Sequence, residues 1–176
     1  MRWQRAAVLG ALAAVLAVLA LGVAREKPPW STPLVGAPAP DFTLDLFEGD
    51  RLRLADLRGR VVLINFWASW CTACKQESPV LQWTWVTYRP RGLVLVGVNI
   101  WDRQQDALAM IREFGKTYPN GPDLSGKILQ DYGVTGIPET FFIDRSGRIA
   151  LKHLGPVTRE LIISNVEPLL SGSASR

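Results

Sequence analysis

The sequence predicts an α/β fold in which helices flank a central mixed sheet. Two uncharged apolar runs, residues 61–64 and 93–98, are typical of strands buried inside a sheet. Each run is followed by a segment that can form a helix, which is the order of parallel strands joined by helical connections. Turn residues at 145–147 then separate two further strands, so the sheet is expected to contain antiparallel pairs as well.

The N-terminal part of the chain differs in composition from the remainder. Residues 1–5 form a short basic leader, and residues 6–24 carry no charge. A helix of that length reaches across roughly 30 Å, the thickness of the hydrocarbon core of a bilayer. Because the leader is positive, we expect residues 6–24 to be a signal-anchor transmembrane helix with the leader in the cytoplasm.

A cleaved signal peptide is the alternative, since residues 22–24 offer small side chains for cleavage. The uncharged run exceeds the ~7–15 apolar residues of a usual signal peptide, which favours an uncleaved anchor. Both interpretations export the remainder: a proline-rich linker at residues 25–35 and a folded domain at residues 36–172. We therefore expect a domain on the extracytoplasmic, periplasmic or outer, side of the cell membrane.

The charge distribution argues against a nucleic-acid-binding domain. Of the net charge of +4, residues 1–30 carry +3, so the exported domain is nearly neutral. A nucleic-acid-binding domain would need a basic face.

The expected domain begins with a β-hairpin that precedes the central strand. Residues 41–44 and 51–54 have strand-like patterns, and the turn residues 48–50 stand between them. The central strand begins at Val61. A segment without glycine follows at residues 72–88 and can form a helix.

The second half of the domain is expected to alternate between strands and helices. Asp102 is the expected N-cap of the helix after the second buried strand, and Gly115 its end. Residues 116–126 are rich in proline, glycine and asparagine and are expected to form a loop. The remaining expected elements are a short helix at 128–132, strands at 141–143 and 148–154, and a helix capped by Thr158.

The only two cysteines stand where the central strand gives way to its helix. Cys71 and Cys74 are separated by two residues, so their sulfurs lie within about one helical turn of each other. One thiolate can then attack a substrate disulfide, and the other can resolve the mixed disulfide. Free N–H groups and the positive end of the helix dipole stabilise a thiolate at the helix start. We interpret Cys71 as the nucleophile and Cys74 as the shielded resolving thiol.

Two other uses of a CxxC pair fit this chain poorly. With two cysteines and one histidine, Cys and His side chains of one chain cannot form a closed four-ligand zinc site. A structural disulfide across two residues closes too short a loop to stabilise the fold much. We expect neither a metal nor another cofactor.

Three separated stretches carry a recognisable pattern: residues 54–71, which end in FWASWC, residues 133–144, GVTGIPETFFID, and residues 152–157, KHLGPV. They resemble the thioredoxin superfamily, and within it the membrane-anchored extracytoplasmic branch that includes TlpA, ResA and CcmG (DsbE). The resemblance covers residues 36–170 and implies a thioredoxin-like fold and exported thiol–disulfide exchange. It further implies reduction of exported cysteine-containing proteins such as apocytochrome c, and a membrane electron donor of the DsbD or CcdA type.

The resemblance also suggests residues that contact the substrate. Pro138 is similar to the cis-proline that lies opposite the CxxC motif in the family, where it would expose the backbone of Ile137 for strand-like pairing. Glu139 is expected to line the substrate groove, with an exposed strand-edge position as the alternative. Trp70 is expected to rim the site, whereas Trp67 is expected to fill the core.

Glu77 is the acidic candidate for proton exchange. It lies three residues after Cys74 and therefore on the same face of the expected helix. The family has a glutamate here, and a partly desolvated carboxyl can exchange protons with the cysteine pair. The alternative is a solvated helix glutamate. Thioredoxin itself has a buried aspartate where this chain has Asn65, which cannot accept a proton in that way.

Two functions remain as alternatives to a protein disulfide reductase. A thiol peroxidase of the peroxiredoxin type would need a threonine three residues before its reactive cysteine, where this chain has Ala68. A copper or haem chaperone would use the cysteines as ligands. Copper chaperones of this fold typically space their cysteines by three and add a histidine, a pattern that the motif does not match.

Overall fold

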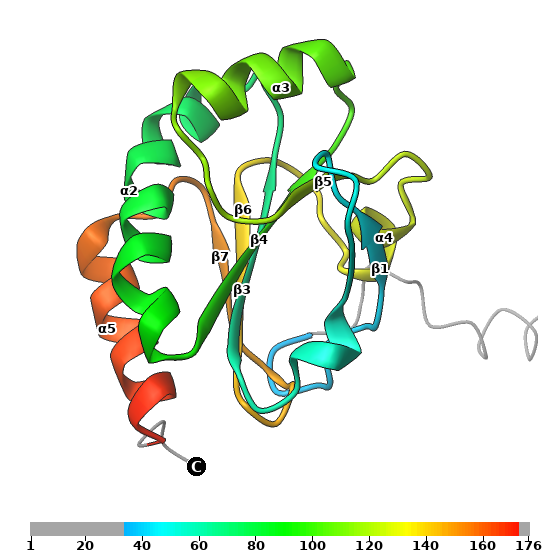
Figure 1. Ribbon diagram of the computed structural model, residues 1–176. Coiled ribbons are helices and arrows are strands. Elements are labelled where there is room, and N and C mark those ends of the chain that lie inside the picture. The colour runs from blue at the N-terminus through cyan, green and yellow to red at the C-terminus, as the bar shows by residue number, and fades with distance from the viewer. Residues whose placement is uncertain (1–33, 173–176) are drawn as a thin grey trace, which may run out of the picture. The chain divides into compact units, whose positions relative to one another are not determined.

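The computed structural model describes residues 34–172 (Figure 1). In chain order its strands and α-helices are β1 (Thr43–Asp45), β2 (Arg51–Arg53), β3 (Val61–Trp67), α2 (Thr72–Tyr88), β4 (Leu93–Asn99), α3 (Gln104–Glu113), β5 (Asn120–Pro122), α4 (Lys127–Asp131), β6 (Glu139–Ile143), β7 (Ile149–Leu154) and α5 (Arg159–Ser171). The expected leader and membrane helix, and most of the expected linker, lie outside the described residues. Within the described range, no helix combines the length and the apolar character needed to cross a membrane.

The main sheet is mixed, as the sequence predicts. Its strand order is β5-β4-β3-β6-β7. β3 is parallel to β4 and antiparallel to β6, so it lies in the middle of the sheet. β1 and β2 form a separate antiparallel pair, which confirms the predicted N-terminal hairpin.

Both faces of the sheet are covered, which explains the continuous apolar runs of β3 and β4. Successive side chains of a strand point to opposite faces. Val62, Ile64 and Phe66 of β3 therefore pack in the core beneath α4 and the hairpin, whereas Val61 and Leu63 pack against α2 and α5. Figure 1 shows α2 and α5 on one side of the sheet and α4 and β1 on the other.

Two expectations about the second half of the domain are wrong. Residues 116–126 are not all loop, because Asn120–Pro122 form the edge strand β5, which pairs in parallel with β4. A proline can end an edge strand, where its missing N–H breaks no inner ladder bond. The N-cap of α3 is Arg103 instead of Asp102, whose carboxylate is engaged elsewhere.

Candidate active site

The two cysteines form a disulfide at the N-terminus of α2. Cys71 has extended backbone angles and is the N-cap residue, and its Sγ accepts a hydrogen bond from the N–H of Cys74 at 3.1 Å. The exposed fraction is 6% for Cys71 and 1% for Cys74. The helix start stabilises negative charge on the first sulfur, which is also the more accessible one.

The segment before β6 lies against this disulfide. β6 pairs with β3, with Glu139 opposite Phe66, so the residues that precede β6 reach the end of the sheet at which the cysteines stand. The Ile137–Pro138 peptide bond is cis, which confirms the expectation from the resemblance. The carbonyl oxygen of Ile137 lies 3.8 Å from the Sγ of Cys71.

Glu77 is buried in the domain, with an exposed fraction of 1%, so the alternative of a solvated helix glutamate is wrong. Its carboxylate accepts a hydrogen bond from the Nδ2 of Asn65 at 2.8 Å and another from the N–H of Val157 at 2.9 Å. Burial raises the pKa of Glu77 to about 7, while these hydrogen bonds and the charge of Lys116 oppose the rise. The carboxyl can therefore bind and release a proton near neutral pH.

Asn65 orients this carboxyl. Its side-chain amide on β3 donates to Glu77 and, at 3.0 Å, to the Oγ1 of Thr140 on β6. From the sequence, Asn65 stands out only as the residue that replaces the buried aspartate of thioredoxin. In the structure its amide bridges the helix that carries the cysteines and the strand that follows Pro138.

A lysine that the sequence analysis did not single out lies in the same region. Lys116, just after α3, is buried, and its Nζ lies 3.7 Å from the centroid of the Trp67 ring. Burial lowers the pKa of Lys116 to about 7, and the negative charge of Glu77 opposes this change. Trp67 is fully buried, as expected, and packs in the same cluster as both cysteines. Gly97 leaves room for it, since a Cβ there would approach the indole nitrogen to 2.9 Å.

Glu139 is fully buried, so the alternative of an exposed strand-edge residue is wrong. Its carboxylate forms an ion pair with Lys152 of β7 at 2.7 Å. Burial raises the pKa of Glu139, although Lys152 and the backbone of Thr135 oppose the rise. The carboxylate is not open to solvent in this structure, and its contact with a substrate stays a prediction.

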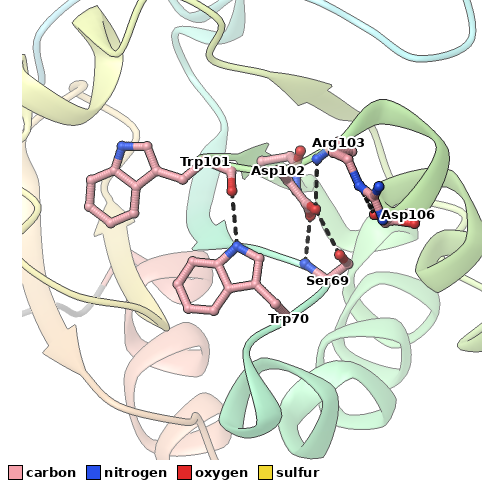
Figure 2. A network of polar contacts seen from close by, with 7 residues as sticks. Ser69, Trp70, Trp101, Asp102, Arg103 and Asp106 are labelled. Atoms are coloured by element: carbon pink, nitrogen blue, oxygen red, sulfur yellow. Dashed lines mark hydrogen bonds and ion pairs between the residues drawn. The ribbon is translucent and has the colours of Figure 1, made fainter.

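Trp70, the residue before Cys71, contacts a second exposed tryptophan. Trp70 has an exposed fraction of 58%, which agrees with its expected place at the rim, and Trp101 one of 61%. The indole N–H of Trp70 donates to the carbonyl oxygen of Trp101 at 2.9 Å (Figure 2). Trp101 has a φ of +50°, a left-handed conformation that is uncommon outside glycine and often occurs at functional sites.

Asp102 holds the loop that carries Trp101 (Figure 2). Its carboxylate accepts hydrogen bonds from the N–H and Oγ of Ser69, at 2.6 and 2.7 Å, and from the Nδ2 of Asn99 at 2.9 Å. Burial favours the neutral acid, but these bonds and one from the backbone of Arg103 hold the pKa of Asp102 below its usual value. The loop after β4 is thereby fixed to the residues that lead into Cys71.

Comparison with known proteins agrees with this geometry. The sequence profile of the AhpC/TSA family matches residues 35–152. The chain is 38% identical over 146 residues to the thiol:disulfide interchange protein HelX of Rhodobacter capsulatus, with 81% of each chain covered. It is 35% identical over 135 residues to the thiol-disulfide oxidoreductase ResA of Geobacillus thermodenitrificans, with 77% of this chain and 78% of the relative covered.

The fold is also found among solved structures. A thiol:disulfide interchange protein of the thioredoxin family from Chlorobium tepidum matches with a TM-score of 0.70 at 29% identity, covering 76% of this chain and 95% of that one. The CxxC pair, its place in the fold and these relatives lead to one identification. The chain belongs to the AhpC/TSA family, has a thioredoxin-like fold, and is a thiol–disulfide oxidoreductase of the HelX and ResA type.

Proposed function

We propose that this oxidoreductase reduces disulfides in exported proteins, with apocytochrome c as its substrate. The observation that carries the proposal is the Cys71–Cys74 disulfide at a helix start, beside Ile137 and next to an exposed aromatic surface. The family resemblance supports the choice of substrate. We further propose that residues 6–24 anchor the enzyme in the cell membrane with the domain on the extracytoplasmic side.

The reaction starts from the reduced enzyme. The Cys71 thiolate attacks one sulfur of the substrate disulfide, a mixed disulfide forms, and the other substrate sulfur leaves as a thiolate that takes a proton from water. Cys74 then gives up its proton and attacks the sulfur of Cys71. The second substrate sulfur is released and protonated, two electrons have passed to the substrate, and the enzyme is left with the disulfide seen here.

Glu77 is the proposed base for Cys74. It stands one turn further along the same helix, and its pKa of about 7 lies close enough to that of a thiol for exchange in both directions. Glu77 takes the proton when Cys74 attacks, and returns it when the disulfide is reduced again. A membrane electron donor of the DsbD or CcdA type would supply the electrons for that step.

The substrate is proposed to bind across Trp70, Trp101 and the backbone at Ile137. Both indoles are exposed, and Trp70 directly precedes the reactive Cys71 and bonds to the backbone of Trp101. Aromatic side chains of this kind are enriched among binding hot spots. A peptide segment that pairs with the Ile137 backbone in a strand-like manner would place its cysteine next to Cys71.

Turnover of three oxidants by the full-length protein tests this function. The substrates are a peptide with an oxidised CxxCH motif, as found at c-type haem attachment sites, oxidised insulin, and hydrogen peroxide. We expect the reduced enzyme to reduce the peptide with a higher kcat/KM than insulin, and to leave peroxide almost unchanged. Equal rates for peptide and insulin would contradict the substrate, whereas peroxide turnover without disulfide reduction would contradict the reductase.

A further inference from the structure

Lys116 is buried, which is an unfavourable environment for the charged side chain of a lysine. Its side chain has an exposed fraction of 4%, and its Nζ has no hydrogen-bond partner within residues 34–172. An amine out of contact with water loses its hydration, which favours the neutral form unless nearby groups stabilise the charge. The face of the Trp67 ring, 3.7 Å away, is one such group.

The groups that face this amine come from several elements. Trp67 lies at the end of β3, Glu77 is on α2, and Tyr118 precedes β5. Burial and the charge of Glu77 both raise the pKa of Tyr118 well above its usual value, so this phenol stays neutral. Asn65 and Trp67 are two residues apart on β3 and therefore project from the same face of the sheet. The Glu77 carboxyl, bonded to Asn65, and the Lys116 amine, over the Trp67 ring, are thus neighbours, and each charge favours the ionised form of the other.

We propose that Lys116 is a positioning residue for proton exchange at the cysteine pair, because its positive charge favours the ionised form of the Glu77 carboxyl, which can accept the Cys74 proton. This inference rests on the proposed role of Glu77 and extends it to a second residue. In the resolving step the proton moves from the Cys74 thiol to the Glu77 carboxylate. The bond between Cys71 and the substrate sulfur breaks as the Cys71–Cys74 bond forms.

The proposal predicts a specific change in pH dependence. Without a cation beside it, Glu77 remains protonated to a higher pH, so fewer molecules hold a competent base at neutral pH. The rate of the resolving step should fall at low pH, where the base becomes protonated, and we call this part of the pH–rate profile the acid limb. In Lys116→Met the acid limb is expected to move up by about one pH unit, the usual effect of one nearby charge. Above the limb the rate should equal that of the wild type, whereas a purely structural defect would lower it at every pH.

Stopped-flow tryptophan fluorescence of the full-length enzyme can measure this step. Reduced enzyme is mixed with an oxidised CxxCH peptide, and the resolving step is the phase whose rate is independent of peptide concentration. Lys127→Met is the matched control, because Lys127 is exposed and its loss changes the net charge equally. Lys116→Gln also removes the charge while retaining a polar side chain, and should shift the limb in the same direction even if Lys116→Met folds poorly.

The two proposals fail in different ways. If Glu77→Gln leaves the acid limb in place, Glu77 is not the base, and the role of Lys116 is overturned with it. If Glu77→Gln removes the limb but neither Lys116 variant moves it, only the role of Lys116 is overturned. A limb that moves in both Lys116 variants, and not in Lys127→Met, supports the proposal.

Discussion

Cys71→Ser is expected to abolish disulfide reduction, and Cys74→Ser is expected to stop the reaction halfway. A serine hydroxyl at position 71 cannot attack a disulfide, because the thiolate is the nucleophile in thiol–disulfide exchange. With Cys71 intact and Cys74 replaced, attack still occurs, but no internal thiol can release the substrate. The mixed disulfide should therefore accumulate, and non-reducing electrophoresis with mass spectrometry of the adduct will detect it.

Cys74→Ala serves as the matched variant for this experiment. It should trap the same adduct as Cys74→Ser, since both variants lack only the resolving sulfur. The adduct should be linked through Cys71, the more accessible of the two sulfurs in the structure. Substantial reduction of substrate by Cys71→Ser would contradict the assignment of Cys71 as nucleophile.

Glu77→Gln is expected to slow the resolving step by ~10²-fold at neutral pH, the lower end of the usual contribution of a general acid or base. It should also change how stability depends on pH. The folded protein raises the pKa of Glu77 from 4.5 to about 7, so between these values it binds a proton that the unfolded chain has released. The free energy of unfolding therefore falls as the pH rises through this window, by at most about 3 kcal/mol.

A glutamine does not titrate, so this fall in stability should disappear in Glu77→Gln. Urea unfolding at a series of pH values measures it, and Glu113→Gln on the exposed surface of α3 is the control. Lys116 titrates with the opposite sign. Its pKa falls from 10.5 to about 7 on folding, so between these values the unfolded chain binds a proton that the folded protein has released. The free energy of unfolding therefore rises with pH over this range. An unchanged slope between pH 4.5 and 7 in Glu77→Gln would contradict the buried, protonated carboxyl.

The fold is largely predictable where burial or local chemistry dominates. The bounds of α2, Thr72–Tyr88, agree with the segment without glycine, and Thr158 caps α5, since its Oγ1 accepts a hydrogen bond from the N–H of Leu161. β5 was not predictable, because three residues that resemble a turn become a strand only through pairing with β4. Aspartate is a favourable N-cap residue, which is why the sequence suggests Asp102. In the structure its carboxylate instead accepts three hydrogen bonds from Ser69 and Asn99.

In the candidate site too, local patterns were predictable from the sequence, whereas contacts between distant segments were not. The cysteine pair at the helix start is a local pattern, so its place was predictable. The groups that surround the Glu77 carboxyl come from β3 and from the segment after α3, which meet α2 only in the folded protein. No regular spacing in the sequence connects Glu77 with Lys116. One usable signal was present: Ser69 and Asp102 follow the adjacent parallel strands β3 and β4, whose ends meet at one edge of the sheet.

Alkylation of the reduced protein tests most directly whether Cys71 is the acidified, accessible sulfur. Iodoacetamide is added to the full-length enzyme at a series of pH values, and mass spectrometry of the peptides measures the modification of Cys71 and Cys74 separately. We expect Cys71 to react first, with a midpoint below the ordinary thiol pKa of about 8.5, while Cys74 stays protected until the protein unfolds. Equal or faster modification of Cys74, or a midpoint for Cys71 at or above that value, would contradict the mechanism.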